Sequence, residues 1–382
     1  MFGNLKRLLA AAVLSAALAA CQVVPHGPPV VAPPTPKPTT GPSGLPEDQN
    51  RHRVALLVPL SGANGAVGHS IENAATMALL DTNASNLRIT TYDTATGASS
   101  AAARAIADGN KLILGPLLGD DVAAVAAKAR PAHVPLISFS NDRSVASRDV
   151  FVMGVVPEQS IDRTVGYALA HGSKRFAAIV PEGEYGQRAE AALRSRVTSG
   201  GGAFVATERY PRGASTIVSA ANRLKAKGGY DTVLIADGAR LSAIGASQLK
   251  KVGAALPRLL GTELWSGEED VARSGALRGA WFSEVSDARW SRFSASYKSR
   301  FGAQPYRVAT LGYDAVLLTL RIARDWRPGR DFPTSQMFDN GGFLGIDGPF
   351  RFRPDGVVDR AMEVRQVGAG TVSVVSPAPT QF

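Results

Sequence analysis

The chain has one cysteine and five scattered histidines among its 382 residues. A single cysteine excludes a disulfide bond within the chain. No two histidines stand at the spacing of metal ligands, so we expect no metal site. Neither a G-x-S-x-G nor a Walker A pattern occurs, and Ser247-Gln248-Leu249-Lys250 matches S-x-x-K without the accompanying S-D-N and K-T-G motifs. We therefore expect no catalytic residues, no cofactor and no enzyme.

The first 21 residues have the pattern of a targeting segment. Two cationic residues precede an apolar run at residues 8–18, which is too short to span a bilayer as a helix. The run ends in Leu18-Ala19-Ala20-Cys21, which resembles the lipobox of bacterial lipoproteins. The resemblance implies that residues 1–20 are a lipoprotein signal peptide and that Cys21 is the lipidation site. Gln22, in place of Asp, resembles the signal for the outer membrane.

Residues 21–50 follow with many prolines, glycines and threonines and few charges. Such a composition buries too little apolar surface to form a core. At about 3.1 Å per residue, a proline-rich segment forms a semi-extended spacer. We expect the acylated cysteine and this tether to hold the remaining chain some distance from a membrane.

The folded part begins with a strand, a glycine-rich turn and a helix. Residues 54–60 form a continuous apolar run, typical of a strand buried on both faces. Turn formers occupy residues 61–65, and helical spacing of apolar residues follows Gly68. Ligands of open α/β sheets lie beyond such strand ends, although an ordinary tight connection has the same pattern. The glycines do not match G-x-G-x-x-G, so no dinucleotide site is expected.

The alternation of strands and helices continues along the chain. It predicts strands at 87–92, 111–115, 134–139, 151–156, 176–180, 203–210 and 232–236, and helices at 98–108, 120–130, 159–171, 186–199, 215–227 and 241–252. This rhythm implies parallel sheets covered by helices on both sides. A folded part of about 330 residues exceeds what one core usually supports, so two lobes are expected.

Short motifs in order along this region identify a family resemblance. They include Ile113-Leu114-Gly115-Pro116, Tyr185-Gly186-Gln187, Leu260-Gly261-Thr262-Glu263 and Gly312-Tyr313-Asp314-Ala315. In this order they resemble the type I periplasmic binding proteins of the Leu/Ile/Val-binding family. The resemblance implies an α/β, two-lobed fold of parallel sheets flanked by helices, with three crossover hinge strands and a ligand cleft between the lobes. It places the domain at 53–375, the first lobe at about 53–156 and 281–356, the second at about 157–280 and 357–375, and a tail at 376–382.

The same resemblance suggests which side chains face the cleft. Tyr185 occupies the family's aromatic position, and Glu263 that of the acid which binds a ligand ammonium. Asp120 and Asp142 stand where hydroxyl groups would bind a ligand carboxylate, and like charge there would cost affinity. Asp120 and Asp121 could instead simply favour the start of a helix. The candidate cleft residues are Ser61, Gly62, Gly119, Asp120, Ser140, Asn141, Asp142, Tyr185, Asp237 and Glu263.

A second resemblance concerns the partner. Gly154-Val155-Val156-Pro157-Glu158 resembles the corresponding region of the lipoprotein activators of penicillin-binding proteins, although their helical-repeat domain is absent. Formal net charge is +10, and arginines gather at Arg321, Arg324, Arg327 and Arg330 and again at Arg351, Arg353, Arg360 and Arg365. This basic character favours an anionic envelope surface or acidic protein, or simply solubilises the chain.

Two functional hypotheses follow. The favoured one is a non-enzymatic lipoprotein, anchored by its lipid at the periplasmic face of the outer membrane, that activates a penicillin-binding protein in peptidoglycan synthesis or binds another envelope protein. The alternative is a solute-binding receptor for an ABC importer permease, specific for amino acids or related small molecules. Nucleic acid is excluded as a partner by the compartment that the lipobox implies.

Overall fold

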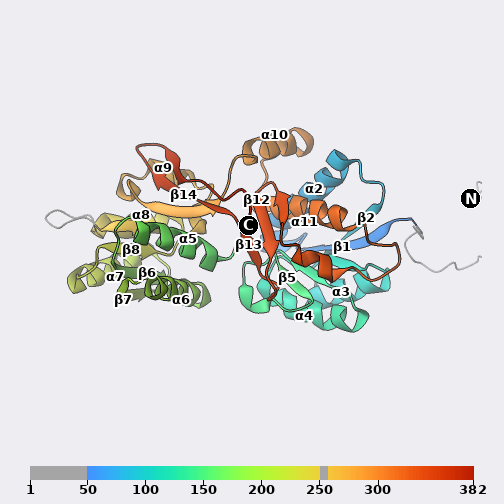
Figure 1. Ribbon diagram of the computed structural model, residues 1–382, viewed down its shortest axis with the longest axis horizontal. Helices are drawn as coiled ribbons and strands as arrows, with labels where there is room; N and C mark the ends of the chain where they lie inside the picture. Colours follow the sequence, from blue (N-terminus) through green and yellow to red (C-terminus); the bar gives the residue numbers. More distant parts are fainter. Residues whose placement is uncertain (1–49, 250–256) are drawn as a thin grey trace, which may run out of the picture. The chain divides into compact units, whose positions relative to one another are not determined.

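The computed structural model describes residues 50–249 and 257–382 (Figure 1). The predicted signal peptide, Cys21 and the proline-rich tether lie outside the described residues, as do residues 250–252 at the end of one predicted helix. Within the described part of the chain, no helix has the length and apolar character needed to cross a bilayer.

The first lobe is built on a five-stranded parallel sheet in the order β2-β1-β3-β4-β5. Successive residues of β1 face opposite sides of this sheet, as in any strand. Val54, Leu56 and Val58 join a core with helices α2 and α11, whereas Ala55 and Leu57 join another with α3 and α4. The strands are β1 (His52–Val58), β2 (Leu87–Asp93), β3 (Leu112–Leu114), β4 (Leu136–Ser138) and β5 (Val150–Val152), and the helices are α2 (Gly65–Thr82), α3 (Ala98–Ala107), α4 (Gly119–Ala129) and α11 (Ala309–Ile322).

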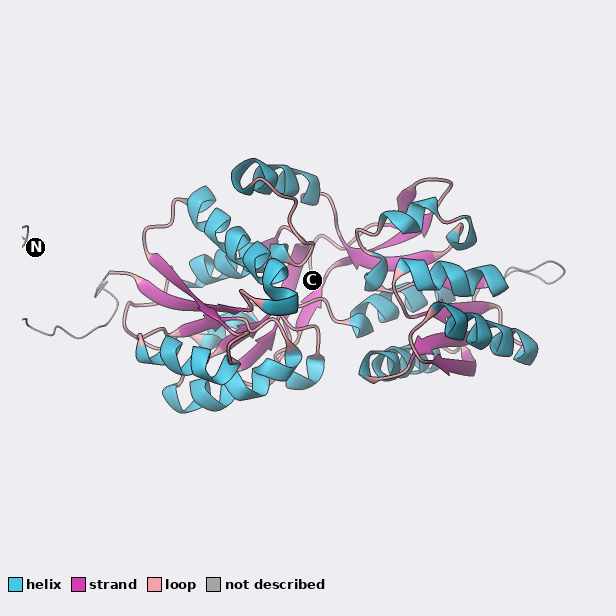
Figure 2. Cartoon of the chain, turned by 180° about the vertical axis from the view of Figure 1, so that it is seen from behind, coloured by secondary structure: helices cyan, strands magenta, loops and turns pink. Residues whose placement is uncertain are grey.

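The second lobe is built on a seven-stranded sheet in the order β15-β14-β10-β9-β8-β6-β7. Strands β6 to β10 are mutually parallel, and β14 and β15 are antiparallel additions at one edge. Helices cover both faces (Figure 2), because alternate residues of β6 pack against α5 and α6 on one side and against α7 and α8 on the other. The elements are β6 (Arg175–Pro181), β7 (Ala203–Tyr210), β8 (Thr232–Ile235), β9 (Arg258–Leu260), β10 (Trp281–Val285), β14 (Met362–Val367), β15 (Val372–Ser376), α5 (Pro157–Ala170), α6 (Glu184–Ser199), α7 (Ala214–Lys227), α8 (Ala239–Leu249) and α9 (Glu269–Arg273).

A small antiparallel sheet completes the fold. It has the order β11-β12-β13, with β11 (Phe343–Gly345), β12 (Gly348–Phe352) and β13 (Val358–Arg360). Its aromatic side chains join the core of the first lobe. Helix α10 (Trp290–Phe301) packs on α2 of that lobe through Phe293 and Tyr297.

The chain passes between the lobes at three places. It leaves β5 for α5, leaves β10 for α10, and passes from β13 to β14 through Ala361 alone. The fold class expected from the sequence, two α/β lobes joined by three crossings, is therefore observed. Two boundaries were wrong. Residues 281–285 were assigned to the first lobe but form β10, whose residues pair with β9 and β14 of the second. Residues 358–360 were assigned to the second lobe but form β13, which pairs with β12 and contributes Val358 to the core of the first.

In both lobes the first strand ends in the same close approach to the helix that follows it, at β1–α2 and at β6–α6. A Cβ on Gly68 of α2 would lie 1.6 Å from the carbonyl oxygen of Pro59. A Cβ on Gly186 of α6 would lie 1.7 Å from that of Pro181. At each position only glycine lets the helix lie so near the strand end.

Candidate functional site

A cavity of about 490 Å³ lies where strands of both lobes end. This volume is typical of sites for small molecules. From the first lobe it is lined by residues that follow β3, β4 and β5, and from the second by residues that follow β9 and end β10. Carboxyl ends of parallel strands are where open α/β sheets bind ligands. We call it the cleft cavity; its lining residues are Leu117, Leu118, Phe139, Asn141, Gly154, Val155, Glu263, Leu264, Ser266, Glu284, Val285, Arg307, Val308, Thr310, Leu311 and Asp347.

Glu263 is an acid in the wall of this cavity with a carboxylate oxygen that lacks a hydrogen-bond partner, as is Glu284. It begins a short 3-10 helix, Glu263–Trp265, whose start is capped by the side chain of Thr262. The hydroxyl of Tyr185 donates to Glu263 Oε1 at 3.0 Å, while Oε2 is shielded from solvent and has no hydrogen-bond partner. Burial raises the pKa of Glu263 to about 7, against the opposing effect of the Tyr185 bond. A donor or cation entering the cavity would satisfy the free oxygen.

Glu284 is a second buried acid that lines the cavity, in the last part of strand β10. Its side chain is almost fully buried and forms an ion pair with Arg365 of β14. Arg365 also contacts Asp287 and Glu363, so several carboxylates share one guanidinium. Burial raises the pKa of Glu284 to about 7, and the positive charge of Arg365 only partly opposes this.

The cavity wall also carries one cation. Arg307, just before α11, pairs through Nη1 with Asp347, whose other oxygen accepts from Thr310 Oγ1 at 2.8 Å. The guanidinium lies over the ring of Trp290, with 4.7 Å between its carbon and the ring centre. Its buried Nε has no hydrogen-bond partner. A ligand carboxylate or carbonyl would be an acceptor for it.

The backbone of Asn141 connects the two lobes beside this cavity. Arg188 of α6 donates through Nη2 to the carbonyl oxygen of Asn141 at 2.7 Å. The same guanidinium binds Glu158 through two hydrogen bonds, of 2.9 and 3.0 Å. Because Asn141 follows β4 and Arg188 lies on α6, this is a direct polar contact between the lobes.

Of the ten candidate residues, Asn141 and Glu263 line the cleft cavity, and Tyr185 contacts it through Glu263. The other seven do not line it, and Asp142 also lies 3.6 Å from Nη1 of Arg188 on α6. Asp142 caps the 3-10 helix Arg143–Val145 by accepting from Ser144 N at 2.8 Å, and Ser140 Oγ accepts from Asp142 N at 3.0 Å. The remaining positions are Ser61, which donates to Asp93; Gly62, in a left-handed turn; Gly119 and exposed Asp120, in the first turn of α4; and Asp237, bound by Tyr210 and Arg212.

Sequence reasoning missed Glu284, Arg307 and Asp347. Glu284 lies in the run Trp281-Phe282-Ser283-Glu284-Val285, where an acid interrupts an apolar strand. That interruption was the available signal, because charged residues are rarely buried unless paired. Arg307 and Asp347 lie in loops and carry no such local sign. Within the described residues, no group of three His, Cys, Asp or Glu side chains is arranged to hold a metal ion.

Comparisons with known proteins agree with this architecture. A family model described as periplasmic binding protein matches residues 52–371. A structure from Rhodospirillum rubrum, assigned as a branched-chain amino acid ABC transporter, superposes with a TM-score of 0.73 at 21% identity, over 85% of this chain and 100% of that one. The branched-chain amino acid transporter substrate-binding protein LivJ of Streptococcus pneumoniae, in complex with isoleucine, gives a TM-score of 0.63 at 18% identity, over 86% and 100%. At this identity the likeness establishes the fold.

A sequence relative is the uncharacterized protein RP748 of Rickettsia prowazekii (strain Madrid E). It is 28% identical over 166 residues, which are 43% of this chain and 44% of that protein. The match thus spans less than half of the relative. The family model, in contrast, covers nearly all of the described residues, and the two lobes and their crossings have the type I architecture. The chain therefore belongs to the periplasmic binding protein family.

Proposed function

We propose that this protein binds a small solute in the cleft cavity and delivers it to an ABC importer. The observation that carries the proposal is the cavity itself, which is bounded by strand ends of both lobes and contains a buried carboxylate oxygen without a partner. A site that served only as a packed interface would have its buried polar atoms satisfied. The solved relatives with transport assignments support this function over activation of a penicillin-binding protein.

The lining favours a solute with an apolar body and a hydrogen-bond donor. Leu117, Phe139 and Val285 supply apolar contacts, and Glu263 accepts an ammonium or another donor. Arg307 provides the group that the sequence seemed to lack, a cation for a ligand carboxylate. An amino acid with an apolar side chain has all three features, as has isoleucine in the pneumococcal relative.

The cellular setting follows from the same proposal. The protein works without catalysis at the periplasmic face of the envelope, and Cys21 carries the lipid that anchors it, in the outer membrane if Gln22 acts as the sorting signal. The partner is the permease of an importer. Activation of a penicillin-binding protein is the competing proposal; it depends on residues 154–158. Those residues already have local roles, since Gly154 and Val155 line the cavity and Glu158 binds Arg188.

A ligand screen by thermal unfolding tests the proposal. Branched, charged and aromatic amino acids and aromatic carboxylic acids would each be added to the purified protein. We expect apolar amino acids to stabilise it saturably, by about 2.7 kcal/mol at one hundred times the Kd. The proposal would be overturned if no compound stabilised the protein and if affinity capture from envelope extracts recovered a penicillin-binding protein without a permease.

A further inference from the structure

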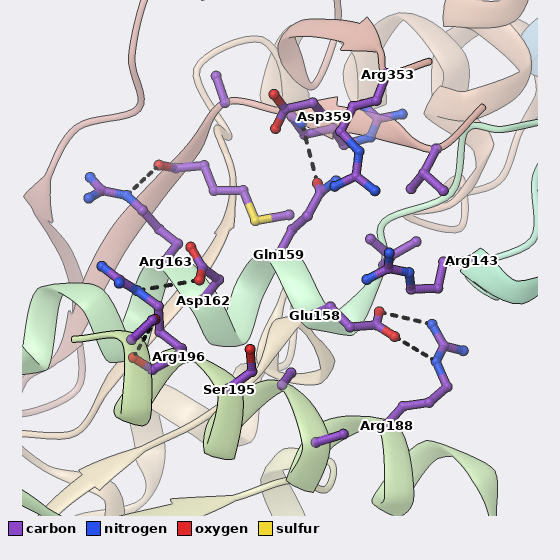
Figure 3. Close-up of a pocket in the computed structure, with 18 of the residues that line it drawn as sticks. Arg143, Glu158, Gln159, Asp162, Arg163, Arg188, Ser195, Arg196, Arg353 and Asp359 are labelled. Atoms are coloured by element: carbon purple, nitrogen blue, oxygen red, sulfur yellow. Dashed lines mark hydrogen bonds and ion pairs between the residues drawn. The ribbon is translucent and has the colours of Figure 1, made fainter. Parts of the chain in front are cut away.

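A second cavity, of about 750 Å³, is lined mainly by arginines and small apolar residues (Figure 3). It is formed by α5 and α6 of the second lobe, by the chain from Arg353 to Met362, by Arg143 after β4, and by the tail. We call it the basic cavity. Six arginines and three acids line it: Arg143, Arg163, Arg188, Arg196, Arg353 and Arg360, with Glu158, Asp162 and Asp359.

The three acids are already paired with arginines. Glu158 binds Arg188 through two hydrogen bonds, as Figure 3 shows, and Asp162 lies 3.3 Å from Arg196 Nε. Asp359 pairs with Arg351, which does not line the cavity. A lining arginine, Arg353, pairs with Asp355 outside it. None of these acids neutralises the remaining cations.

Three lining arginines form no salt bridge with a carboxylate among the described residues, although Asp347 and Asp314 act electrostatically on Arg360 and Arg143 acts on Asp355. Arg163, half-buried, donates only to neutral acceptors: Met362 O at 3.1 Å, Ser376 Oγ at 2.6 Å and Pro377 O at 3.3 Å. Arg360 is 5% exposed and donates to Met153 O, while its buried Nε and Nη1 have no hydrogen-bond partner. Arg143 is exposed and makes no side-chain hydrogen bond or ion pair within the described part of the chain. Burial lowers the pKa of both Arg163 and Arg360, although the negative charges of Asp347 and Asp314 partly oppose this for Arg360.

The positive charge in the basic cavity therefore differs from that of arginines on an ordinary solvated surface. Of the second arginine group seen in the sequence, Arg351, Arg353 and Arg365 are paired with acids, and Arg360 is buried. A buried guanidinium whose N–H groups form no hydrogen bond with an anion is costly, because its lost hydration is not replaced. Arginine also presents a planar set of donors that matches phosphate and carboxylate groups in geometry.

We propose that the basic cavity binds a small polyanion, a molecule with two or more phosphate or carboxylate groups. Arg143, Arg163 and Arg360 come from the first lobe, the second lobe and the β13–β14 crossing, so one anion with separated charges would contact all three parts. Val156, Val357 and Met362 give the cavity an apolar wall for the ligand's carbon skeleton. The site is distinct from the cleft cavity, and the proposal does not rest on solute transport.

The two cavities nevertheless lie on either side of one crossing. Val155 lines the cleft cavity and Val156 the basic cavity, and Asn141 and Arg143 are divided in the same way. A polyanion held across this crossing would favour one arrangement of the lobes. A ligand can shift such an equilibrium only by its different affinity for the two arrangements.

Binding of two probes, inorganic pyrophosphate and citrate, tests the site. Each would be titrated into the full-length protein by calorimetry at constant ionic strength, so that general screening is held fixed. We expect saturable binding of at least one probe; pyrophosphate alone would indicate phosphate groups and citrate alone carboxylates. In the double variant Arg143→Gln and Arg163→Gln, the affinity should fall by about tenfold or more, since two charged contacts are lost.

A matched control removes the same charge elsewhere. Arg324→Gln with Arg327→Gln changes two exposed arginines that do not line the cavity and should leave probe affinity unchanged. Glu263→Gln should likewise leave it unchanged, which separates this site from the cleft. The proposal would be overturned if neither probe bound saturably, or if the Arg143/Arg163 variant bound as well as the control variant.

Discussion

The cleft cavity and the basic cavity lie on two sides of the same chain crossing but have opposite chemistry. The cleft cavity has two buried carboxyls, Glu263 and Glu284, whose pKa burial raises to about 7, and its one lining arginine, Arg307, is paired with Asp347. A carboxyl can become neutral by taking up a proton, so an empty cleft need not hold an unpaired charge. Arginine remains charged in a protein. The arginines of the basic cavity therefore stay charged when no anion is bound. The carboxyls of the cleft can be either protonated or ionised.

Removing the cation behind the cleft should have the largest effect. Arg365→Ala leaves Glu284, Glu363 and Asp287 without their shared partner. We expect the free energy of unfolding to fall by about 3–5 kcal/mol, as when one member of a buried pair is removed. Denaturant unfolding measures this, with exposed Arg324→Ala as the control expected to stay within about 0.5 kcal/mol. The loss should be smaller at pH 5 than at pH 8, because a protonated Glu284 needs no cation; equal loss at both would contradict this account.

The next effect concerns ligand affinity in the cleft. Glu263→Gln retains an oxygen for the Tyr185 hydroxyl but removes the negative charge. We expect the affinity for an amino acid to fall by about 2–5 kcal/mol, the cost of removing one partner of a buried charge pair. Calorimetry would measure it, while unfolding of the empty protein should change little below about pH 4.5, where the Glu263 carboxyl is protonated in both the folded and the unfolded chain. An undiminished affinity would exclude Glu263 as the ammonium partner.

The free energy of unfolding should depend on pH because of the Glu263 carboxyl. The pKa of Glu263 is about 7 in the folded protein, above its ordinary value of 4.5. Between these values the folded chain retains a proton that the unfolded chain has released. Stability from this group is therefore fully present below pH 4.5 and is lost as pH rises to about 7.

The expected loss is about 1–3 kcal/mol, and Glu263→Gln should abolish it. Chemical denaturation of both proteins at several pH values would give the difference. Parallel curves for the wild type and the variant would mean that the carboxyl is solvated in the folded state.

The smallest effects are expected at exposed arginines that line neither cavity. Arg324→Glu with Arg327→Glu should change the unfolding free energy by less than about 0.5 kcal/mol. Neither amino-acid nor polyanion binding should change. If the chain instead activates an envelope synthase through its basic surface, association with that partner should slow and become less dependent on salt. Surface-based kinetics with envelope proteins would detect this.

Most of the fold could be predicted from apolar patterns. The run at residues 54–60 became β1, and the helix expected at 98–108 is α3, Ala98–Ala107. The strand expected at 151–156 is shorter, Val150–Val152. It ends early because the chain there leaves the sheet to cross between lobes, and the apolar residues that follow line cavities instead. A run of apolar residues does not show whether it forms a buried strand or lines a cavity.

The site was less predictable because it joins residues that are distant in sequence. Glu263 and Tyr185 came from family resemblance, and they do contact each other. Asp142 was expected to face a ligand but caps a 3-10 helix, and the local order Asp142-Arg143-Ser144 is the usual pattern of such a cap. That Arg163 and Arg360 form no salt bridge could not be predicted from the sequence. It depends on which other residues the surrounding carboxylates are bonded to.

The division of the hydrophobic cores has a consequence for how the molecule melts. Among the described residues, no apolar cluster combines side chains of the five-stranded sheet with those of the seven-stranded sheet. The lobes are joined by three crossings and by polar contacts such as that of Arg188 with Asn141. Each lobe is then a cooperative unit of its own, and a calorimetric scan of the empty protein should show two overlapping transitions. A molecule bound between the lobes would make them melt as one, so the shape of the heat-capacity peak would itself report occupancy.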